Sequence, residues 1–394
     1  MHPAALFSLL WFTVLLLHFI FSFTLLNELP PLSISTYFIF FIGVIAFSFG
    51  SFIQTVYWQK NNKPARIYKL SDDEISQALR YIFSIIIIAG LPFFVLASYR
   101  IFLASNVENF FIGLRTELIY SDKDIGSLKY LFPFSLVVYA ANLQSFLVNK
   151  KQSNRVLFLI SLFITIVYAI LNTGRLSFLL VLVIYMGMNF IYKKDFSLKK
   201  LALPVLIFLA VFIAFGIVYG KGGNIETSAK ENITPAAQTT AVYMVASLNA
   251  LDWDLHHQFR VNYDGNNSLR FFVKLGKQLD LISNAEVNTL LTPFVFVPYG
   301  TNVYTFYSTY IKDFGKFYSW FMIALFGLIH TFLYNKAITT KRFRYSLYYS
   351  IMLFPLLISF FADQYLTLTS LWLQMIFLIE GVIFLNKFFT KEND

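Results

Sequence analysis

Long apolar runs repeat along the chain, and they constrain its fold more than any other feature. Runs that approach bilayer-spanning length occur at approximately 5–26, 34–58, 77–104, 130–148, 156–171, 176–192, 201–219, 317–334, 346–362 and 366–386. A helix of about 20 apolar residues crosses the hydrocarbon core, where it satisfies its own backbone hydrogen bonds. The sequence therefore predicts an all-α, polytopic integral membrane protein with about ten transmembrane helices.

The amino-acid composition is typical of a protein that is embedded in lipid. Of its 394 residues, 57% are hydrophobic and 13% are charged, which is about half the charged fraction of soluble domains. Cysteine is absent, and this excludes disulfides, thiolate metal sites and a cysteine nucleophile. The net charge of +10 could suggest nucleic acid, but most basic residues flank the apolar runs, where topology explains them. We expect a lipid partner and no nucleic acid.

The basic residues also predict which way the chain faces. They concentrate after the second, fourth, sixth and eighth apolar runs and in the C-terminal tail, so these segments and both termini are expected on the cytoplasmic side. The chain then divides into a bundle of about seven helices (1–219), a large outer loop (220–316) and about three further helices with a short tail (317–394). Within the loop, 236–251 is expected as an interfacial or re-entrant helix, and 269–282 as an amphipathic helix on the membrane.

Two arginines stand at the outer ends of predicted helices. Arg175 follows Asn172-Thr173-Gly174 in the tight turn between the fifth and sixth runs, and Arg115 lies in the loop 105–128. A rigidly held guanidinium matches phosphate oxygens bidentately. Two structural alternatives remain open: Arg175 could be an interfacial anchor, and Arg115 could form a surface pair with Glu117.

The large loop holds the densest group of titratable residues. Asp254 and His256 lie in the sequence Asp-Trp-Asp-Leu-His-His at 252–257, and Arg260 and Arg270 follow. A carboxylate beside a histidine can raise the imidazole pKa towards working pH, so an acid–base role is possible for Asp254 or His256. The alternative is the ordinary polarity of a solvated loop. A metal site is only weakly indicated, because no established ligand spacing is present.

The segment 300–315 is the most distinctive in the chain. Tyr304, Tyr307 and Tyr310 recur every third residue, and Asn302 and Asp313 flank them. This spacing predicts that the three tyrosines line one side of a helix at the outer membrane surface, either as an aromatic belt or as rings that stack on sugar faces. Asn302 and Asp313 would then offer polar groups to sugar hydroxyls.

In these features the chain resembles the O-antigen polymerase family, the oligosaccharide repeat-unit polymerases of Gram-negative inner membranes. The resemblance rests on Thr173-Gly174-Arg175-Leu176-Ser177 before a long outer loop and, above all, on Asn302-Val-Tyr304-Thr-Phe with Tyr310 and Asp313-Phe-Gly315 before a late span. The architecture matches over nearly the whole chain, but the matching residues cover about a tenth of it. A GT-C-like membrane fold is implied.

The resemblance implies transfer of a growing glycan from undecaprenyl pyrophosphate to a new lipid-linked repeat unit at the periplasmic face. It implies no nucleotide sugar, metal or other cofactor, and a partner protein is expected to control chain length. The departing pyrophosphate needs fixed cations, for which Arg175, Arg115 and Arg260 or Arg270 are available. The acceptor hydroxyl needs at most one base, with His256, Asp254 and Asp313 as candidates.

Two other functions stay open at this point. An O-antigen ligase has a similar topology and the same kind of donor. It would need a histidine and an arginine in the outer loop, and the His256-His257 pair could supply the histidine. A flippase or transporter of lipid-linked oligosaccharide is expected to carry charged residues along a central path, whereas the apolar runs here are almost free of charge, with Glu380 the main exception.

Overall fold

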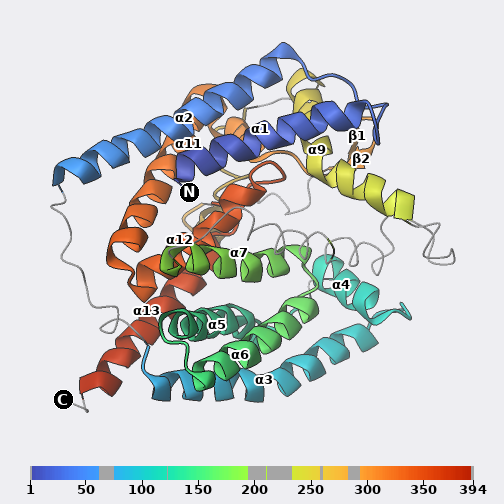
Figure 1. Cartoon of the computed structure of the whole chain (residues 1–394). Coiled ribbons are helices and arrows are strands. Elements are labelled where there is room, and N and C mark those ends of the chain that lie inside the picture. Colours follow the sequence, from blue (N-terminus) through green and yellow to red (C-terminus); the bar gives the residue numbers. More distant parts are fainter. Residues whose placement is uncertain are drawn as a thin grey trace. The chain divides into compact units, whose positions relative to one another are not determined.

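The computed structural model describes residues 2–61, 75–121, 123–193, 210, 233–257, 261–282 and 293–391 (Figure 1). Its elements are helical, apart from one antiparallel pair of two-residue strands in which Val295 faces Thr301. In chain order they are α1 (Pro3–Ser22), α2 (Ile34–Asn61), α3 (Gln77–Leu103), α4 (Phe110–Tyr120), the 3-10 helix η2 (Gly126–Tyr130), α5 (Leu131–Val148), α6 (Gln152–Leu171), α7 (Arg175–Tyr192), α9 (Ile233–His257), α10 (Arg270–Gln278), β1 (Val295–Phe296), β2 (Gly300–Thr301), α11 (Phe306–Thr340), α12 (Phe343–Ile358) and α13 (Thr369–Lys391).

The prediction of an all-α, membrane-embedded protein is confirmed. Seven helices in the described part of the chain are long and apolar enough to cross a membrane, namely α1, α2, α3, η2 with α5, α6, α11 and α13. The helices α7 and α12 are apolar but shorter. Helices cover each expected run except 201–219, which lies outside the described residues apart from Ala210. The total of about ten spans stays a prediction.

The surfaces of these helices carry large apolar side chains. Phe12 on α1, Phe41 on α2 and Phe93 on α3 are each more than 60% exposed. Exposed apolar area costs roughly 25 cal/mol per Å² in water, and this cost disappears when hydrocarbon covers the surface. Such side chains are what a lipid-facing helix requires.

The chain forms two compact units, each built from segments that lie far apart in the sequence. Unit 1 comprises 1–64, 222–335 and 352–370, and unit 2 comprises 65–221, 336–351 and 371–394. The outer loop expected at 220–316 therefore shares a unit with the first two helices.

Unit 2 is organised around α5, which packs against α3, α6 and α7. Most residues of α5 are buried, including polar ones such as Asn142, and the Asn142 amide donates to the Ser84 hydroxyl of α3 over 3.2 Å. Tyr168 of α6 donates to the carbonyl of Ile87 over 2.8 Å. These contacts give polar groups partners inside an apolar bundle, where an unpaired group would be costly.

Unit 1 depends on a close approach of α2 and α11. A side chain added at Gly50 would place its Cβ 1.8 Å from the carbonyl oxygen of Ala324, and one added at Gly327 would lie 2.0 Å from the carbonyl oxygen of Phe47. Small residues allow helix backbones to touch in this way within membranes. A hydrogen bond between Ser51 and Thr331 lies in the same interface, and α1 packs on α2 (Figure 1).

The helix α11 folds back on itself at Gly315, whose φ of 69° and ψ of 172° are not helical. In a straight helix Tyr307 and Trp320 would be about 20 Å apart along the axis, yet their ring centroids lie 6.1 Å apart. Tyr310 and Phe326 are likewise separated by 5.3 Å. The segment 306–314 is thus a short helix that packs against the longer segment 316–340, and glycine permits the left-handed turn between them.

We predict that Gly50→Ala destabilises the protein although alanine is the better helix former by about 1 kcal/mol. The new Cβ meets backbone of α11, which cannot move aside as a flexible side chain could. Overpacking of this kind costs about 1–3 kcal/mol, so the melting temperature of the purified protein in detergent should fall by several degrees.

The matched control is Gly381→Ala on α13. Among the described residues, no atom lies within 4 Å of a Cβ added there, so its melting temperature should stay level or rise. Equal melting temperatures for the two variants would contradict the close approach of α2 and α11.

Candidate functional site

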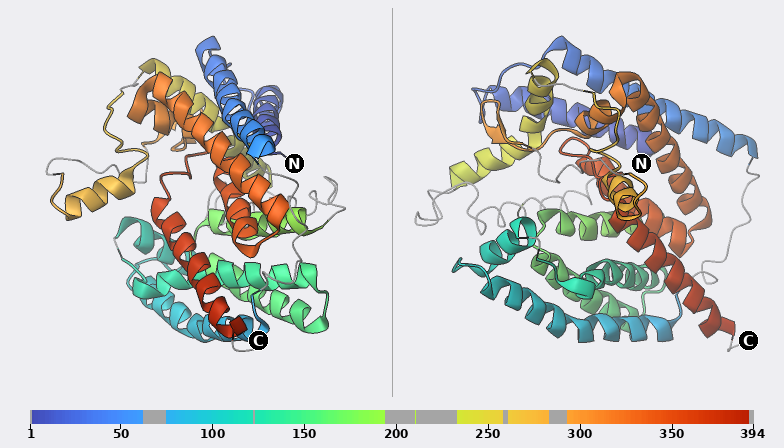
Figure 2. Two further views of the ribbon diagram at one scale, coloured as in Figure 1. Left: turned by 90° about the vertical axis from the view of Figure 1, so that its left-hand side faces the viewer. Right: turned by 180° about the vertical axis from the view of Figure 1, so that it is seen from behind.

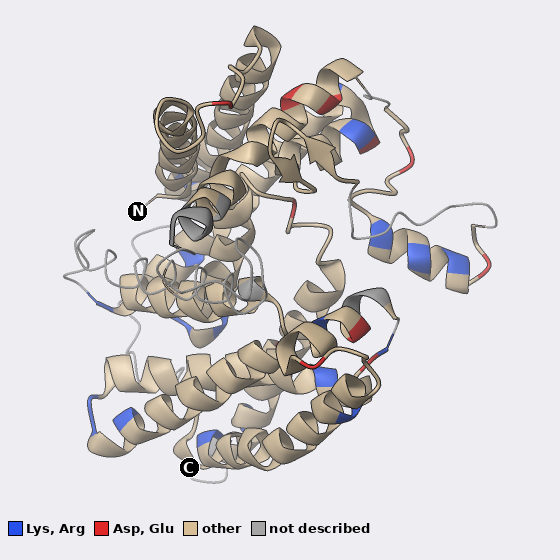
Figure 3. Cartoon of the chain, turned by 90° about the vertical axis from the view of Figure 1, so that its right-hand side faces the viewer, with Lys and Arg blue, Asp and Glu red and all other residues tan. Residues whose placement is uncertain are grey.

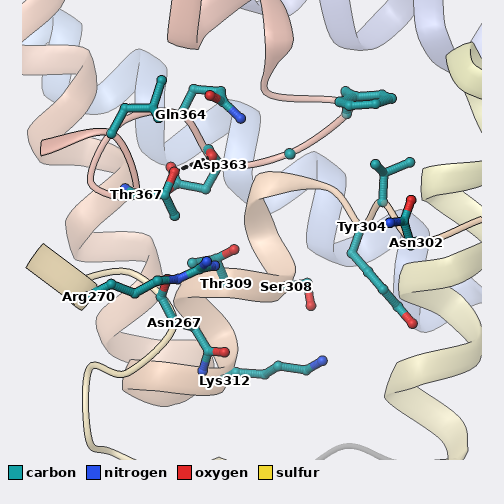
Figure 4. Close-up of a pocket in the computed structure, with 14 residues that line it drawn as sticks. Asn267, Arg270, Asn302, Tyr304, Ser308, Thr309, Lys312, Asp363, Gln364 and Thr367 are labelled. Atoms are coloured by element: carbon teal, nitrogen blue, oxygen red, sulfur yellow. Dashed lines mark hydrogen bonds between the residues drawn. The ribbon is translucent and has the colours of Figure 1, made fainter. Parts of the chain in front are cut away.

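Unit 1 contains a polar pocket of about 220 Å³. Three segments form its walls: the turn that leads into α10, the start of α11 with the residues before it, and the loop between α12 and α13 (Figure 4). Its lining is rich in amide, hydroxyl and charged side chains and consists of Asn267, Arg270, Asn302, Val303, Tyr304, Ser308, Thr309, Lys312, Phe361, Ala362, Asp363, Gln364, Thr367 and Leu368.

Arg270 is held in the pocket wall through the carboxylate of Asp313. Asp313 is buried and accepts hydrogen bonds from the backbone N–H and the amide of Asn267, at 3.1 and 2.6 Å. It also accepts from the backbone N–H and the hydroxyl of Ser268, both at 2.6 Å. The carbonyl of Asn267 in turn accepts from Nε of Arg270 over 2.8 Å. Asp313 therefore fixes the turn, and the turn fixes the guanidinium.

Asp363 supplies a carboxyl group to the same pocket. Its Oδ1 accepts from the Tyr310 hydroxyl over 2.6 Å and from the backbone N–H of Tyr365 over 3.0 Å, and its Oδ2 accepts from the N–H of Thr367 over 3.1 Å. Burial raises the pKa of Asp363, and these hydrogen bonds oppose the rise. The group combines a fixed position with a reduced preference for the ionised form.

The charges of Arg270 and Asp363 influence each other across the pocket. Burial lowers the pKa of Arg270, whereas the carboxylates of Asp363 and Asp313 act in the opposite direction. A guanidinium stays protonated in proteins at any working pH. The pocket thus offers a permanent cation near a titratable carboxyl group, and Figure 4 shows both side chains together with the hydroxyl of Thr309.

Lys312 provides a second cation, and Asp254 balances it. The Lys312 Nζ lies 2.7 Å from Oδ2 of the buried Asp254, and 5.1 Å from the centre of the Tyr304 ring. Burial, followed by the charge of Asp254, raises the pKa of Tyr304 to about 12. Tyr304 is therefore a neutral phenol whose ring and hydroxyl can contact a polar ligand.

The titratable residues of α9 point to different places. Asp252 accepts from the hydroxyl groups of Ser33 and Thr36 at the start of α2, where a carboxylate stabilises the helix N-terminus. Asp254 pairs with Lys312. The exposed His256 ring donates through Nδ1 to the carbonyl of Asp252 over 2.7 Å. Nδ1 of His256 also lies 3.9 Å from Oδ1 of Asp252, so the carboxylate beside this histidine is that of Asp252.

The structure corrects the expected arrangement of the three tyrosines. The helix α11 begins at Phe306, so Tyr304 precedes it and lines the pocket beside Asn302. Tyr307 and Tyr310 lie on α11 but are fully buried in a hydrophobic cluster. Tyr307 packs on Trp11 with ring centroids 4.9 Å apart. Periodicity identified a shared helix face but could not tell whether that face was surface or core.

Arg115 and Arg175 belong to unit 2. Arg115 donates through Nη1 to the carbonyl of Thr173 over 3.2 Å. The helix α4 therefore contacts the turn that precedes Arg175, the first residue of α7. Glu117 pairs with Lys123 over 2.7 Å. Arg260 lies outside the described residues.

Two charged residues of the pocket lining, Asp363 and Lys312, were not predicted from the sequence. Asp363 stands in the short gap between the apolar runs 346–362 and 366–386, so the reasoning applied to Arg175 in its tight turn could have found it. Lys312 directly precedes Asp313 in the distinctive segment, but its pairing with Asp254 depends on a contact across 58 positions of the chain.

Within the described ranges, no group of three or more His, Asp or Glu side chains is arranged to hold a metal ion. Comparison with protein-family models, with curated proteins and with solved structures finds no match to this chain.

We predict that Asp313→Asn destabilises the protein by about 2–3 kcal/mol, because an asparagine amide cannot accept from four donors and places its own N–H groups against theirs. The melting temperature in detergent should fall accordingly. Asp280→Asn is the control, since Asp280 is exposed and has a left-handed backbone that asparagine also adopts. If both variants melted like the unmodified protein, the four-donor clamp would not exist.

Proposed function

We propose that this chain is a membrane glycosyltransferase of the oligosaccharide repeat-unit polymerase type. It transfers a growing glycan from undecaprenyl pyrophosphate to the terminal sugar hydroxyl of a new lipid-linked repeat unit. The observation that carries the proposal is the pocket of unit 1, in which Arg270 and Asp363 share one polar cavity of a membrane-embedded protein.

The proposed reaction makes three demands, and the pocket offers a group for each. The bond between the anomeric carbon and the pyrophosphate oxygen breaks, and the departing negative charge needs a fixed cation, which Arg270 supplies. The acceptor oxygen bonds to the anomeric carbon, and its proton passes to the carboxylate of Asp363. Asn302, Tyr304 and the hydroxyl of Thr309 offer hydrogen bonds and a ring face to sugar.

Asp363 is the proposed base, in place of the three candidates named from the sequence. Asp313 and Asp254 are each occupied by donors or by a cation, and His256 does not line the pocket. Asp313 is a positioning residue, since it acts through Asn267 on Arg270. The proposed phosphate-binding roles of Arg115 and Arg175 stay predictions.

The proposal includes the location of the chain. We infer the bacterial inner membrane, with both termini in the cytoplasm and the pocket at the periplasmic side. The support is the distribution of basic residues: the segment 336–344 between α11 and α12 holds Lys336, Lys341, Arg342 and Arg344, which the positive-inside rule assigns to the cytoplasm. The opposite end of the long α11 segment lies at 316, next to Gly315, and that of α12 lies at 358. The pocket residues Lys312 and Phe361 stand close to these two ends in the chain.

Deletion of the encoding gene in its host tests the proposal and separates it from its alternatives. Loss of a polymerase leaves lipopolysaccharide core that carries one repeat unit, as seen by gel electrophoresis, whereas loss of a ligase or flippase leaves bare core.

Complementation with Arg270→Ala should fail to restore long chains, and Arg270→Lys should restore them poorly, because a point charge lacks the bidentate fork. Arg100→Ala, at an exposed arginine of α3, is the matched control and should complement fully. Full-length chains with Arg270→Ala would refute the role of this residue.

The pH dependence of polymerisation tests Asp363 as the base. A base must be ionised, so the rate falls as the pH drops through its pKa. Because burial raises the pKa of Asp363, this decline should begin at a higher pH than for an exposed aspartate. Asp363→Asn should lower the rate by about 10²–10⁴-fold and remove this acid limb, measured with membranes and lipid-linked repeat units. An unchanged rate and acid limb in this variant would show that another group accepts the proton.

A further inference from the structure

The helix α10 has two opposed faces, and neither belongs to a transmembrane span. Arg270, Lys274 and Lys277 recur at spacings of four and three residues and so share one face. Phe272, Leu275 and Leu279 recur at three and four residues on the opposite side. No residue of α10 is acidic, and Asp280 stands two residues after its end. The helix therefore separates a cationic face from an apolar face.

The apolar face is exposed over its whole length. Phe272 is 50% exposed, Leu275 40% and Leu279 59%, and the turn that follows adds Leu281 at 76%. The helix is attached to the unit through Val273 and Gly276, which are buried on its flank. In the left view of Figure 2, α10 (gold) extends away from the other helices of unit 1, and Figure 3 shows its band of basic residues. Exposed large apolar side chains in one stripe indicate a surface that something covers.

We propose that α10 docks on the surface of the bilayer and binds anionic phospholipid headgroups. The protein is embedded in a membrane, so a lipid surface is available along its whole circumference. A helix with phenylalanine and leucine on one face and lysine on the other lies in the interfacial plane, with its apolar face at the boundary of the acyl chains. Lys274 and Lys277 then lie among the headgroups, where basic residues are attracted to negative charge.

Docking of α10 has a consequence for the pocket. Arg270 is both the first residue of α10 and part of the pocket wall, so the lipid that holds the helix also steadies the guanidinium. This consequence rests on the proposed function, whereas the docking itself does not. A failure of docking would leave the deletion phenotype unchanged, and a failure of the polymerase proposal would leave the lipid contacts of α10 unchanged.

The absence of cysteine from the chain allows a direct test. Single cysteines introduced by Leu279→Cys on the apolar face and by Gln278→Cys on the polar side are labelled with a polarity-sensitive fluorophore. The full-length protein is placed in nanodiscs of phosphatidylcholine alone or with phosphatidylglycerol. We expect a blue-shifted emission at 279 that a lipid-borne nitroxide quenches, stronger with phosphatidylglycerol and weakened by salt. The probe at 278 should stay in water.

The double substitution Lys274→Gln with Lys277→Gln isolates the role of charge. In the Leu279→Cys background it should abolish the difference between the two lipid compositions, in a protein that still shows a cooperative melting transition. An unshifted, unquenched probe at 279 would overturn the proposal. So would emission that is equal in both lipids, or a blue shift that the lipid quencher does not reach, since the latter would indicate that another protein surface covers α10.

Discussion

The reversal of α11 at Gly315 is the constraint on which unit 1 depends. It converts one long apolar segment into two packed helices, so that the segment 306–314 lies beside 316–340 rather than in line with it. The short helix brings Lys312 and Asp313 next to the turn before α10, and it brings Tyr310 next to the loop that contains Asp363. In a straight helix these side chains would lie about 10–20 Å from the groups that they contact in this structure. One positive φ angle therefore assembles the pocket from three separate segments.

The carboxylates of unit 1 show how charge is tolerated close to an apolar core. Asp313 accepts from neutral N–H and O–H donors, Asp254 pairs with Lys312, and Asp252 caps the start of α2. Each arrangement replaces the hydration that burial removes, because an unpaired buried charge would cost several kcal/mol. Asp363 has comparable donors but also faces the cavity, so it combines structural support with access to a ligand. This difference distinguishes the candidate base from the other three.

Local patterns in the sequence predicted the helices. They failed where contacts between residues far apart in the chain determine the position and role of a side chain. Hydropathy located the apolar helices, because spanning length is a property of consecutive residues. Arg270, Asn302 and Tyr304 were predicted as ligand-binding residues and do line one pocket. Tyr307 and Tyr310 were expected at a surface, but the reversal at Gly315 buries them against α1, α2 and Phe326. The roles of Asp254 and Asp313 depended on partners at positions 312 and 267–268, and no local pattern specifies such pairs.

The Asp313-Phe314-Gly315 triplet illustrates why a distinctive motif need not contain the reacting groups. Gly315 makes the turn, Phe314 stacks on Tyr310, and Asp313 holds the turn that carries Arg270. All three act on geometry rather than on a ligand. The groups that line the cavity, Arg270 and Asp363, stand in segments whose sequences are less conspicuous. In a membrane protein whose pocket must be built from helix ends, the strictest sequence requirements fall on the residues that hold those ends together, because their backbone conformation and hydrogen bonds admit few substitutes.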